Sequence, residues 1–324
     1  MRTDSIKLYS LFLAKMNNDY FLSEANLKEH LAVIEKIFET DKILNEDINL
    51  TKIQKYYRDS NFGYNLAHSK EGSVHMAINY DGVFHEDGYY EQVKEIDEII
   101  KKKEARVLEL GCGKGFNSKY LAERNPNIGF QGIDVTERHL KYAAAKSKEI
   151  ENLTVAFGNF HELQFNDQQF DYVFELESVC HSDNPEKVLS EVHRVLQPGG
   201  KFILFEGFRT KNFDHLSPNQ KKASYLIEKT MGVNNGHNIE EWLKIAEKIG
   251  FEVEVNDDIS EAIMPNLSRF HRLAGKYFKR VGLAKVVYKI MSKNLIKNTI
   301  AGWLMPFSIM QGMQSYNRII LLKK

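Results

Sequence analysis

Cysteine and proline are scarce in this chain of 324 residues, which has two cysteines and six prolines. Cys112 and Cys180 cannot build the disulfide framework of a small secreted domain, and no spacing typical of a zinc site is present. We therefore expect a reduced, cytoplasmic protein without a metal site. The apolar runs are short and interrupted by charges, so the sequence predicts neither a signal peptide nor a membrane span.

Acidic residues are missing from the C-terminal part, because no Asp or Glu follows Glu261. The whole chain is neutral, with 44 basic and 44 acidic residues, but residues 265–324 hold 12 of the basic ones. Residues 1–264 therefore carry a net charge of −12. This split predicts an anionic partner for the basic segment, such as a membrane surface. Nucleic acid is disfavoured because the remainder is acidic. The alternative is a lid helix whose lysines are simply solvated.

The hydrophobic pattern divides the chain into four parts. Residues 1–55 carry an apolar stripe at helical spacing, which predicts a helical extension. Residues 56–90 are polar and aromatic without a period, so we expect an ordered loop on the substrate side. Together they form the N-terminal part, residues 1–90. Residues 91–258 alternate between short apolar strands and amphipathic helices. Residues 259–315 predict a basic helical insertion that covers the substrate, and residues 316–324 predict a last strand.

Alternation of strands and helices predicts an α/β fold with parallel strands and helices on both faces of the sheet. Right-handed crossovers then produce a doubly wound sheet. The expected strands are residues 106–110, 129–134, 153–158, 170–176, 201–207, 251–255 and 316–324. The expected core helices are residues 91–103, 116–124, 137–149, 185–196 and 239–249.

The most informative motif is VLELGCGKG, residues 107–115. Gly111, Gly113 and Gly115 follow a buried strand and precede a helix, the junction at which open α/β sheets bind nucleotides. Asp134 closes the next strand, where an acidic side chain can accept hydrogen bonds from ribose hydroxyls. The motif differs from the dinucleotide fingerprint and lacks the Lys-Ser/Thr ending of a phosphate-binding loop.

This motif and the order of elements over residues 104–208 resemble class I S-adenosylmethionine-dependent methyltransferases. The resemblance implies a Rossmann-like seven-stranded methyltransferase sheet and S-adenosylmethionine as the cofactor. It places Glu109 at the amino-acid part of the cofactor, although a helix-capping carboxylate is the alternative. Asn159 stands where the family usually has an Asp that contacts adenine. The predicted cofactor-binding residues are Glu109, Gly111, Cys112, Gly113, Gly115, Asp134, Val135, Asn159, Phe160 and Glu175.

The segment ELESVCHSD, residues 175–183, follows the strand that normally faces the transferred methyl group. Glu177, Cys180 and His181 match the Glu-x-x-Cys-His segment of sterol side-chain methyltransferases. Glu177, Ser178 and His181 also resemble the corresponding segment of gamma-tocopherol methyltransferases. The chain resembles further parts of these groups at Tyr56 and Tyr57, in the GSVHM segment with His75, and over the C-terminal residues 303–324.

Glu177, His181 and His75 are the predicted catalytic residues. A carboxylate can stabilise a carbocation formed on an alkene, and a base must then remove a proton. The structural alternatives are a helix cap for Glu177 and hydrogen-bonded structural histidines for His75 and His181. Cys180 is expected to pack rather than react.

The sequence thus favours a methyltransferase that methylates carbon on a lipophilic isoprenoid-like acceptor, such as a sterol, a terpenoid or a prenylated ring. An N- or O-methyltransferase of a small amphiphile is the alternative, and a non-catalytic cofactor-binding protein is disfavoured by the intact motifs. We expect a cytoplasmic protein at the periphery of a membrane. The sequence is also compatible with a homo-oligomer.

Overall fold

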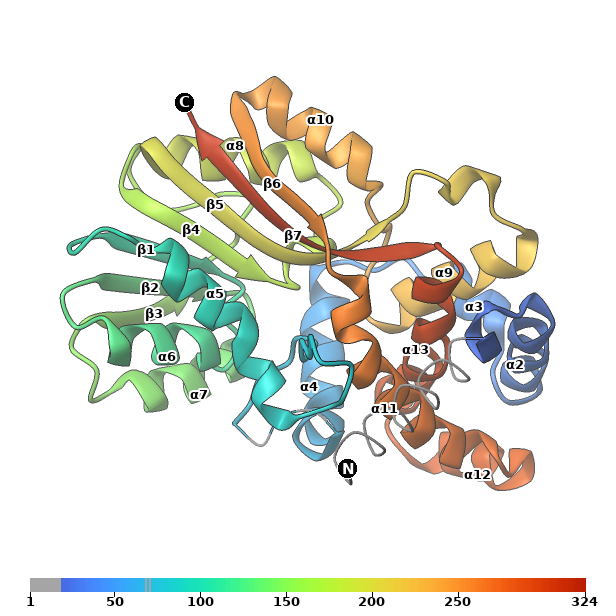
Figure 1. Ribbon diagram of the computed structural model, residues 1–324. Coiled ribbons are helices and arrows are strands. Elements are labelled where there is room, and N and C mark those ends of the chain that lie inside the picture. The colour runs from blue at the N-terminus through green and yellow to red at the C-terminus, as the bar shows by residue number, and fades with distance from the viewer. Residues whose placement is uncertain (1–18, 68, 70) are drawn as a thin grey trace, which may run out of the picture.

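A computed structural model describes residues 19–67, 69 and 71–324 and shows a seven-stranded sheet with helices on both faces (Figure 1). Its strand order is β3-β2-β1-β4-β5-β7-β6, and among these strands β7 alone runs opposite in direction to the others. This confirms the predicted fold class. The strands are β1 Arg106–Leu110, β2 Gly129–Asp134, β3 Leu153–Phe157, β4 Phe170–Leu176, β5 Leu196–Arg209, β6 Phe251–Asp258 and β7 Gln314–Lys323.

Side chains alternate between the two faces of the sheet, as the period of two in a strand requires. Val107 of β1 packs on one face with α5 and α6, whereas its neighbour Leu108 packs on the other face with α8 and α10. The sheet is therefore buried on both sides, which explains the nearly continuous apolar strands. The core helices are α5 Glu91–Ile99, α6 Phe116–Arg124, α7 Glu137–Ser147, α8 Pro185–Val195 and α10 Ile239–Ile249.

A second group of helices lies beside one end of the sheet and covers its carboxyl edge (Figure 1). It joins the N-terminal extension to the insertion, because His30 of the extension packs against His271 and Trp303 of the insertion. His271 Nδ1 donates to the Trp303 carbonyl oxygen over 2.8 Å. These helices are α2 Glu24–Ile37, α3 Thr40–Leu44, α4 Leu50–Ala67, α9 Pro218–Thr230, α11 Ser260–Phe278, α12 Val281–Ile290 and α13 Lys293–Met310.

Two parts of the chain differ from the sequence-based expectation. Helix α4 extends to Ala67, so the prediction of a loop from residue 56 is wrong for residues 56–67. The helix is stabilised by tertiary contacts, since Tyr56 and Ser60 hydrogen-bond to Asn298 of α13. Helix α9 was not predicted, although Ser217 and Gln220 form a capping box at its start. Residues 1–18 of the predicted extension lie outside the described residues.

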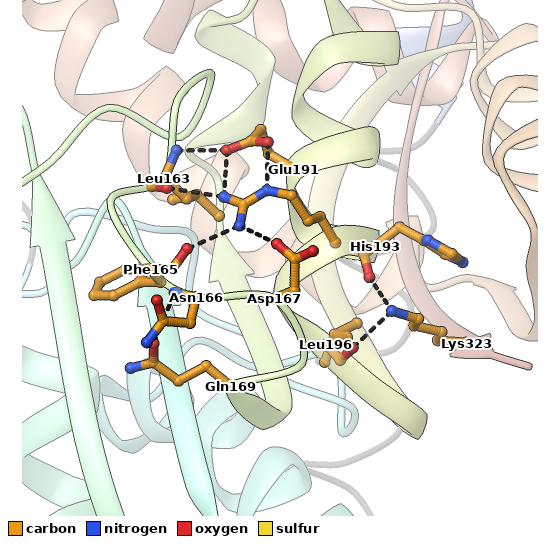
Figure 2. Close-up of polar contacts among 10 residues, drawn as sticks. Leu163, Phe165, Asn166, Asp167, Gln169, Glu191, His193, Leu196 and Lys323 are labelled. Carbon is orange, nitrogen blue, oxygen red and sulfur yellow. Dashed lines mark hydrogen bonds and ion pairs between the residues drawn. The ribbon is translucent and has the colours of Figure 1, made fainter.

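Arg194 of α8 ties this helix to the loop that follows β3. Its Nε and Nη2 donate to both carboxylate oxygens of Glu191 over 2.9 and 2.8 Å. Its Nη atoms also donate to the carbonyl oxygens of Leu163 and Phe165 and to the carboxylate of Asp167. Glu191 in turn accepts from the backbone N–H of Leu163, so the loop is held from several sides (Figure 2).

We expect Arg194→Lys to lower the free energy of unfolding by about 1–3 kcal/mol, because an ammonium group cannot reproduce the planar fork that satisfies two carbonyls and two carboxylates. Urea denaturation followed by circular dichroism measures the change. Arg124→Lys is the matched control, since Arg124 forms an exposed ion pair with Asp97 and its replacement should leave stability nearly unchanged. Equal effects of the two changes would contradict the proposed role of the network.

Candidate active site

A cleft of about 1040 Å³ lies at the carboxyl ends of the first parallel strands. This is the position where open α/β sheets bind ligands. Six of the predicted cofactor-binding residues line it: Gly111, Gly113, Asp134, Val135, Asn159 and Phe160. Their positions agree with the sequence-based prediction, whereas their roles in binding stay predictions.

Asp134 shapes the glycine turn at the base of the cleft. Its carboxylate accepts from the backbone N–H of Gly113 over 2.9 Å and of Thr136 over 2.6 Å. Burial raises the pKa of Asp134, but hydrogen bonding to His139 and to these two amides outweighs it and holds the pKa below its usual value. An ionised Asp134 can therefore accept hydrogen bonds from a ligand as well as from the loop.

The glycine turn leaves room for a ligand. Gly113 has a φ of +52°, and a Cβ atom built there meets no neighbour within 4 Å, so a side chain would project into open space. At Gly111, with a φ of +68°, a Cβ atom would collide with Ser178. The positive φ favours glycine at both positions, and at Gly111 the contact with Ser178 excludes a side chain as well.

Four predicted cofactor-binding residues do not line the cleft. Glu109 is buried and accepts from Asn117 Nδ2 and from the backbone N–H and hydroxyl of Ser118. It caps the start of α6, which is the alternative role that the sequence allowed. Cys112 packs against Gly132, and Gly115 begins α6 at a φ of +73°. Glu175 is fully buried and accepts from the turn that follows Glu177.

Asn159 lines the cleft, but its amide oxygen serves the protein itself. Asn159 Oδ1 lies 3.0 Å from the backbone nitrogen of His161 and 2.9 Å from His161 Nδ1. The resemblance predicts that Asn159 contacts adenine. In the structure its amide oxygen holds the loop beside the cleft.

Two mainly apolar cavities adjoin the cleft. The inner cavity, of about 930 Å³, is bounded by β5, α9 and β7 and includes Cys180, Glu206, Phe208, Met231 and Tyr316 in its wall. The outer cavity, of about 860 Å³, lies between α4, α11 and α13 and includes Tyr56, Phe270, Leu273, Leu295 and Met305 in its wall. Glu177 and Val74 line the cleft and both cavities, so these two residues mark the junction.

Glu177 is held in an unusual position directly after β4. Its φ of +53° falls in the left-handed region, which is costly for a residue with a side chain. One carboxylate oxygen, Oε1, accepts from the Met76 backbone N–H over 2.6 Å and from the Tyr316 hydroxyl over 2.8 Å. Burial nevertheless raises the pKa of Glu177 to about 7. Within the described residues, Oε2 accepts no hydrogen bond and is available to a ligand.

Two further buried carboxyl groups lie near Glu177. Burial raises the pKa of Glu175 to about 8, and the pKa of Glu206 is raised well above its usual value by burial and by the other two carboxyls. Like charges in a dry environment oppose one another, so all three cannot ionise together near neutral pH. Of the three, Glu177 is the one that lines the cleft as well as both cavities.

His181 pairs with Tyr57 at the junction of the cleft and the inner cavity. His181 Nδ1 lies 2.9 Å from the carbonyl oxygen of Gly232, so this nitrogen carries the proton. Nε2 then accepts from the Tyr57 hydroxyl over 2.7 Å. Burial lowers the pKa of His181, which keeps the ring neutral and able to act as a base.

His75 is the predicted catalytic residue that the structure does not bring to the site. It is 2% exposed, and its ring nitrogens contact the Met76 carbonyl oxygen and Asn117 Oδ1 at 3.1 Å. Burial lowers the pKa of His75 to about 4. This side chain lines neither the cleft nor the cavities, so we correct its role to that of a structural histidine.

Tyr57 and Tyr316 are site residues that the sequence did not assign. Tyr57 lies in the part of α4 predicted to be a loop, and Tyr316 lies in the last strand, far from the motifs along the chain. The resemblance of residues 56–57 and 303–324 to known substrate-side segments was the only signal for them.

Within the described residues, no group of three or more His, Cys, Asp or Glu side chains is arranged to hold a metal ion.

Comparison with known families explains this arrangement of cleft and motifs. A family described as a methyltransferase domain matches residues 101–249, which extend from before β1 to the end of α10. The core of this chain is thus similar to a methyltransferase domain. The match contains the glycine turn, Asp134, and the segment with Glu177 and His181.

Curated relatives that match this chain include sterol methyltransferases. The chain is 31% identical over 157 residues to sterol 24-C-methyltransferase of Saccharomyces cerevisiae, which covers 48% of this chain and 41% of the relative. It is 27% identical over 205 residues to a 24-methylenesterol C-methyltransferase of Oryza sativa, which covers 62% of this chain and 56% of the relative. The chain thus spans about half the length of the curated relatives that it matches.

Solved structures share the fold over most of this chain, beyond residues 101–249. Cyclopropane synthase MmaA2 from Mycobacterium tuberculosis aligns with a TM-score of 0.71 at 14% identity, covering 86% of this chain and all of that one. Geranyl diphosphate C-methyltransferase from Streptomyces coelicolor aligns with a TM-score of 0.60 at 14% identity, covering 85% of this chain and all of that one. At this identity the likeness establishes the fold.

We expect Tyr316→Phe to raise the pKa of Glu177 by roughly one unit or more, because a hydrogen bond to an ionised group contributes about 1.5–3 kcal/mol. Carbon-13 NMR of labelled glutamate carboxyl groups follows the titration. Tyr80→Phe is the control, since the Tyr80 hydroxyl donates to Glu95 on the surface and leaves Glu177 unaffected. An unchanged or lowered pKa of Glu177 in Tyr316→Phe would show that this contact does not stabilise the carboxylate.

Proposed function

We propose that this protein is an S-adenosylmethionine-dependent methyltransferase that methylates carbon on a lipophilic isoprenoid-like acceptor, such as a sterol, a terpenoid or a prenylated ring. The observation that carries the proposal is the position of Glu177 at the junction between the cleft and the apolar cavities. The sterol methyltransferases among the curated relatives support the choice of acceptor class.

The residues of the cleft fit the cofactor. Gly113 permits close approach of a ligand to the backbone, Asp134 offers an ionised carboxylate for ribose hydroxyls, and α6 begins with its N-terminus at the cleft. The N-terminus of a helix favours a carboxylate group such as that of an amino acid. S-adenosylmethionine supplies an electrophilic methyl group carried on a sulfonium.

An alkene acceptor becomes positively charged when its carbon is methylated. The carboxylate of Glu177 stabilises such a charge, and its effect is large because the surrounding cavity is mostly apolar. A proton must then leave the acceptor, and the neutral His181, joined to the Tyr57 hydroxyl, provides a base at the same junction. The remaining side chains position the acceptor and exclude water.

The acidic cavity also favours one alternative, methylation of an amine on a small amphiphile. Glu177 and Glu206 line the inner cavity, and a carboxylate there would hold an ammonium or amine group. Lipophilic walls such as Phe208, Met231 and Met305 favour the isoprenoid acceptor instead.

We place the reaction in the cytoplasm, at the surface of the membrane from which such an acceptor comes.

We expect radiolabelled S-adenosylmethionine to transfer its label to the neutral isoprenoid fraction of a lipid extract, with the new methyl group on carbon in the product's mass and NMR spectra. The measurement is separation of labelled products from parallel reactions with lipid extract and with polar metabolites. Label in amines or polar metabolites alone would overturn the isoprenoid assignment and support the alternative.

Glu177→Gln should lower kcat by about 100-fold to 1000-fold, as the loss of a charge that stabilises the transition state does. In the unchanged protein kcat/KM should rise with pH through about 7, because Glu177 is ionised above its pKa and protonated below it. The variant should lose this rise. Glu240→Gln, an exposed change in α10, is the control for both measurements. A normal pH profile in Glu177→Gln would exclude this carboxylate as the essential group.

Asp134→Asn should weaken binding of S-adenosylhomocysteine at least about tenfold, because the amide loses the charge-assisted hydrogen bonds of the carboxylate. Isothermal titration calorimetry measures the affinity, and circular dichroism checks that the variant is folded. The exposed Asp87→Asn serves as the control. Unchanged affinity would remove Asp134 from the proposed cofactor site.

A further inference from the structure

Helix α12 lies at the end of the molecule that is remote from the sheet (Figure 1). It turns Ala284 into the protein, where this side chain is 1% exposed. Its outer side carries Leu283, Val286 and Ile290, which are 57%, 54% and 76% exposed. Their spacing of i, i+3 and i+7 aligns them along one side of the helix, so they form a continuous apolar ridge. Apolar patches of this kind mark interaction surfaces.

Basic side chains surround the ridge. Lys279, Arg280, Lys285, Lys289 and Lys293 are exposed, and in the part of the chain that the structure describes none of these five forms an ion pair. We call these five residues the basic rim. The combination of a narrow apolar ridge and flanking lysines is typical of helices that lie in a membrane interface.

Two acidic side chains face the basic rim, one from α2 and one from the turn between α2 and α3. Glu35 and Glu39 share a groove with Lys285 and Lys289. Glu35 pairs with Lys222, and Glu39 pairs with Lys42, so their charges are balanced elsewhere. The rim therefore keeps a strong positive charge, which complements an anionic surface.

The outer cavity reaches the surface beside this helix. Leu273 of α11 lines the cavity and is 39% exposed. Leu295, in the first turn of α13, lines the opposite wall and follows the exposed Met291 by four residues. Helix α12 thus connects the two helices, α11 and α13, whose apolar side chains line the outer cavity.

We infer that the ridge and the basic rim dock the protein on an anionic phospholipid bilayer, and that the acceptor passes from the bilayer into the outer cavity between α11 and α13. The nature of the acceptor rests on the proposed function, whereas the docking does not. Each lysine near an anionic membrane contributes about a fivefold gain in affinity, and salt screens this gain within a Debye length of about 8–10 Å.

Co-sedimentation of the full chain with vesicles tests the docking. The protein should bind vesicles of phosphatidylcholine with phosphatidylserine, bind vesicles of phosphatidylcholine alone much more weakly, and dissociate at high salt. Lys285→Gln with Lys289→Gln should weaken binding to the anionic vesicles about thirtyfold. Leu283→Ser with Ile290→Ser should weaken it at least about tenfold, because both side chains lose their apolar burial.

Matched changes away from the ridge should leave binding unchanged. Lys141→Gln with Lys148→Gln removes two exposed lysines at α7, and Val83→Ser removes an apolar side chain that is 44% exposed. All changed positions are exposed, so each variant should keep the melting temperature of the unchanged protein. Weakening by the controls as large as by the ridge variants would overturn the assignment to α12.

The remaining outcomes separate docking from catalysis. Equal binding to neutral and anionic vesicles, or none to either, overturns the docking, whatever the activity. Loss of a dimer in analytical ultracentrifugation when Leu283 and Ile290 are changed would show that the ridge binds a second copy of the chain instead. Methylation of a lipid extract dissolved in detergent should be equal in the ridge variants and the unchanged protein. Absence of methylation in both would contradict the proposed function and leave the vesicle result standing.

Discussion

Burial of carboxyl groups at the carboxyl edge of the sheet is the constraint on which the site depends. Glu175, Glu177 and Glu206 come from β4, from the turn after it and from β5, and burial raises the pKa of each. Removing carboxyl groups from water is costly, and at least one oxygen of each accepts a backbone hydrogen bond. The backbone N–H groups of residues 76, 178, 180 and 207 are the donors. The backbone around the site therefore provides hydrogen-bond donors for all three carboxyl groups.

The donors for Glu177 come from segments that lie on either side of the core along the chain. Met76 precedes the first strand, and Tyr316 belongs to the last one. The pairing of β7 between β5 and β6 brings Tyr316 to the junction of the cleft and the cavities. Residues 101–249 thus provide most of the cleft, whereas the added helices and the last strand complete the two cavities beside it. Charge follows the same division, with an acidic core and a basic insertion.

The strands and core helices were predictable because their apolar residues recur at regular spacing and because turn or capping residues mark their ends. The cleft residues were predictable because strand ends of a parallel sheet meet at one edge. Helix α4 was not, since its polar residues favour a loop locally and find their partners only in the folded chain, as Tyr56 and Ser60 do at Asn298 of α13. Glu109 and His75 were assigned to the site by position along the chain, but burial beside Asn117 directs both to structural roles.

The sequence by itself determined the fold class, the glycine turn, the segment with Glu177 and His181, and the charge asymmetry, because these follow from residue types at short spacing. Tertiary structure decided which groups meet. It joined Tyr57 to His181, placed Tyr316 on Glu177, and left the ridge of α12 exposed rather than packed. Contacts between residues more than a hundred positions apart depend on how strands and helices pack, and no local pattern encodes them.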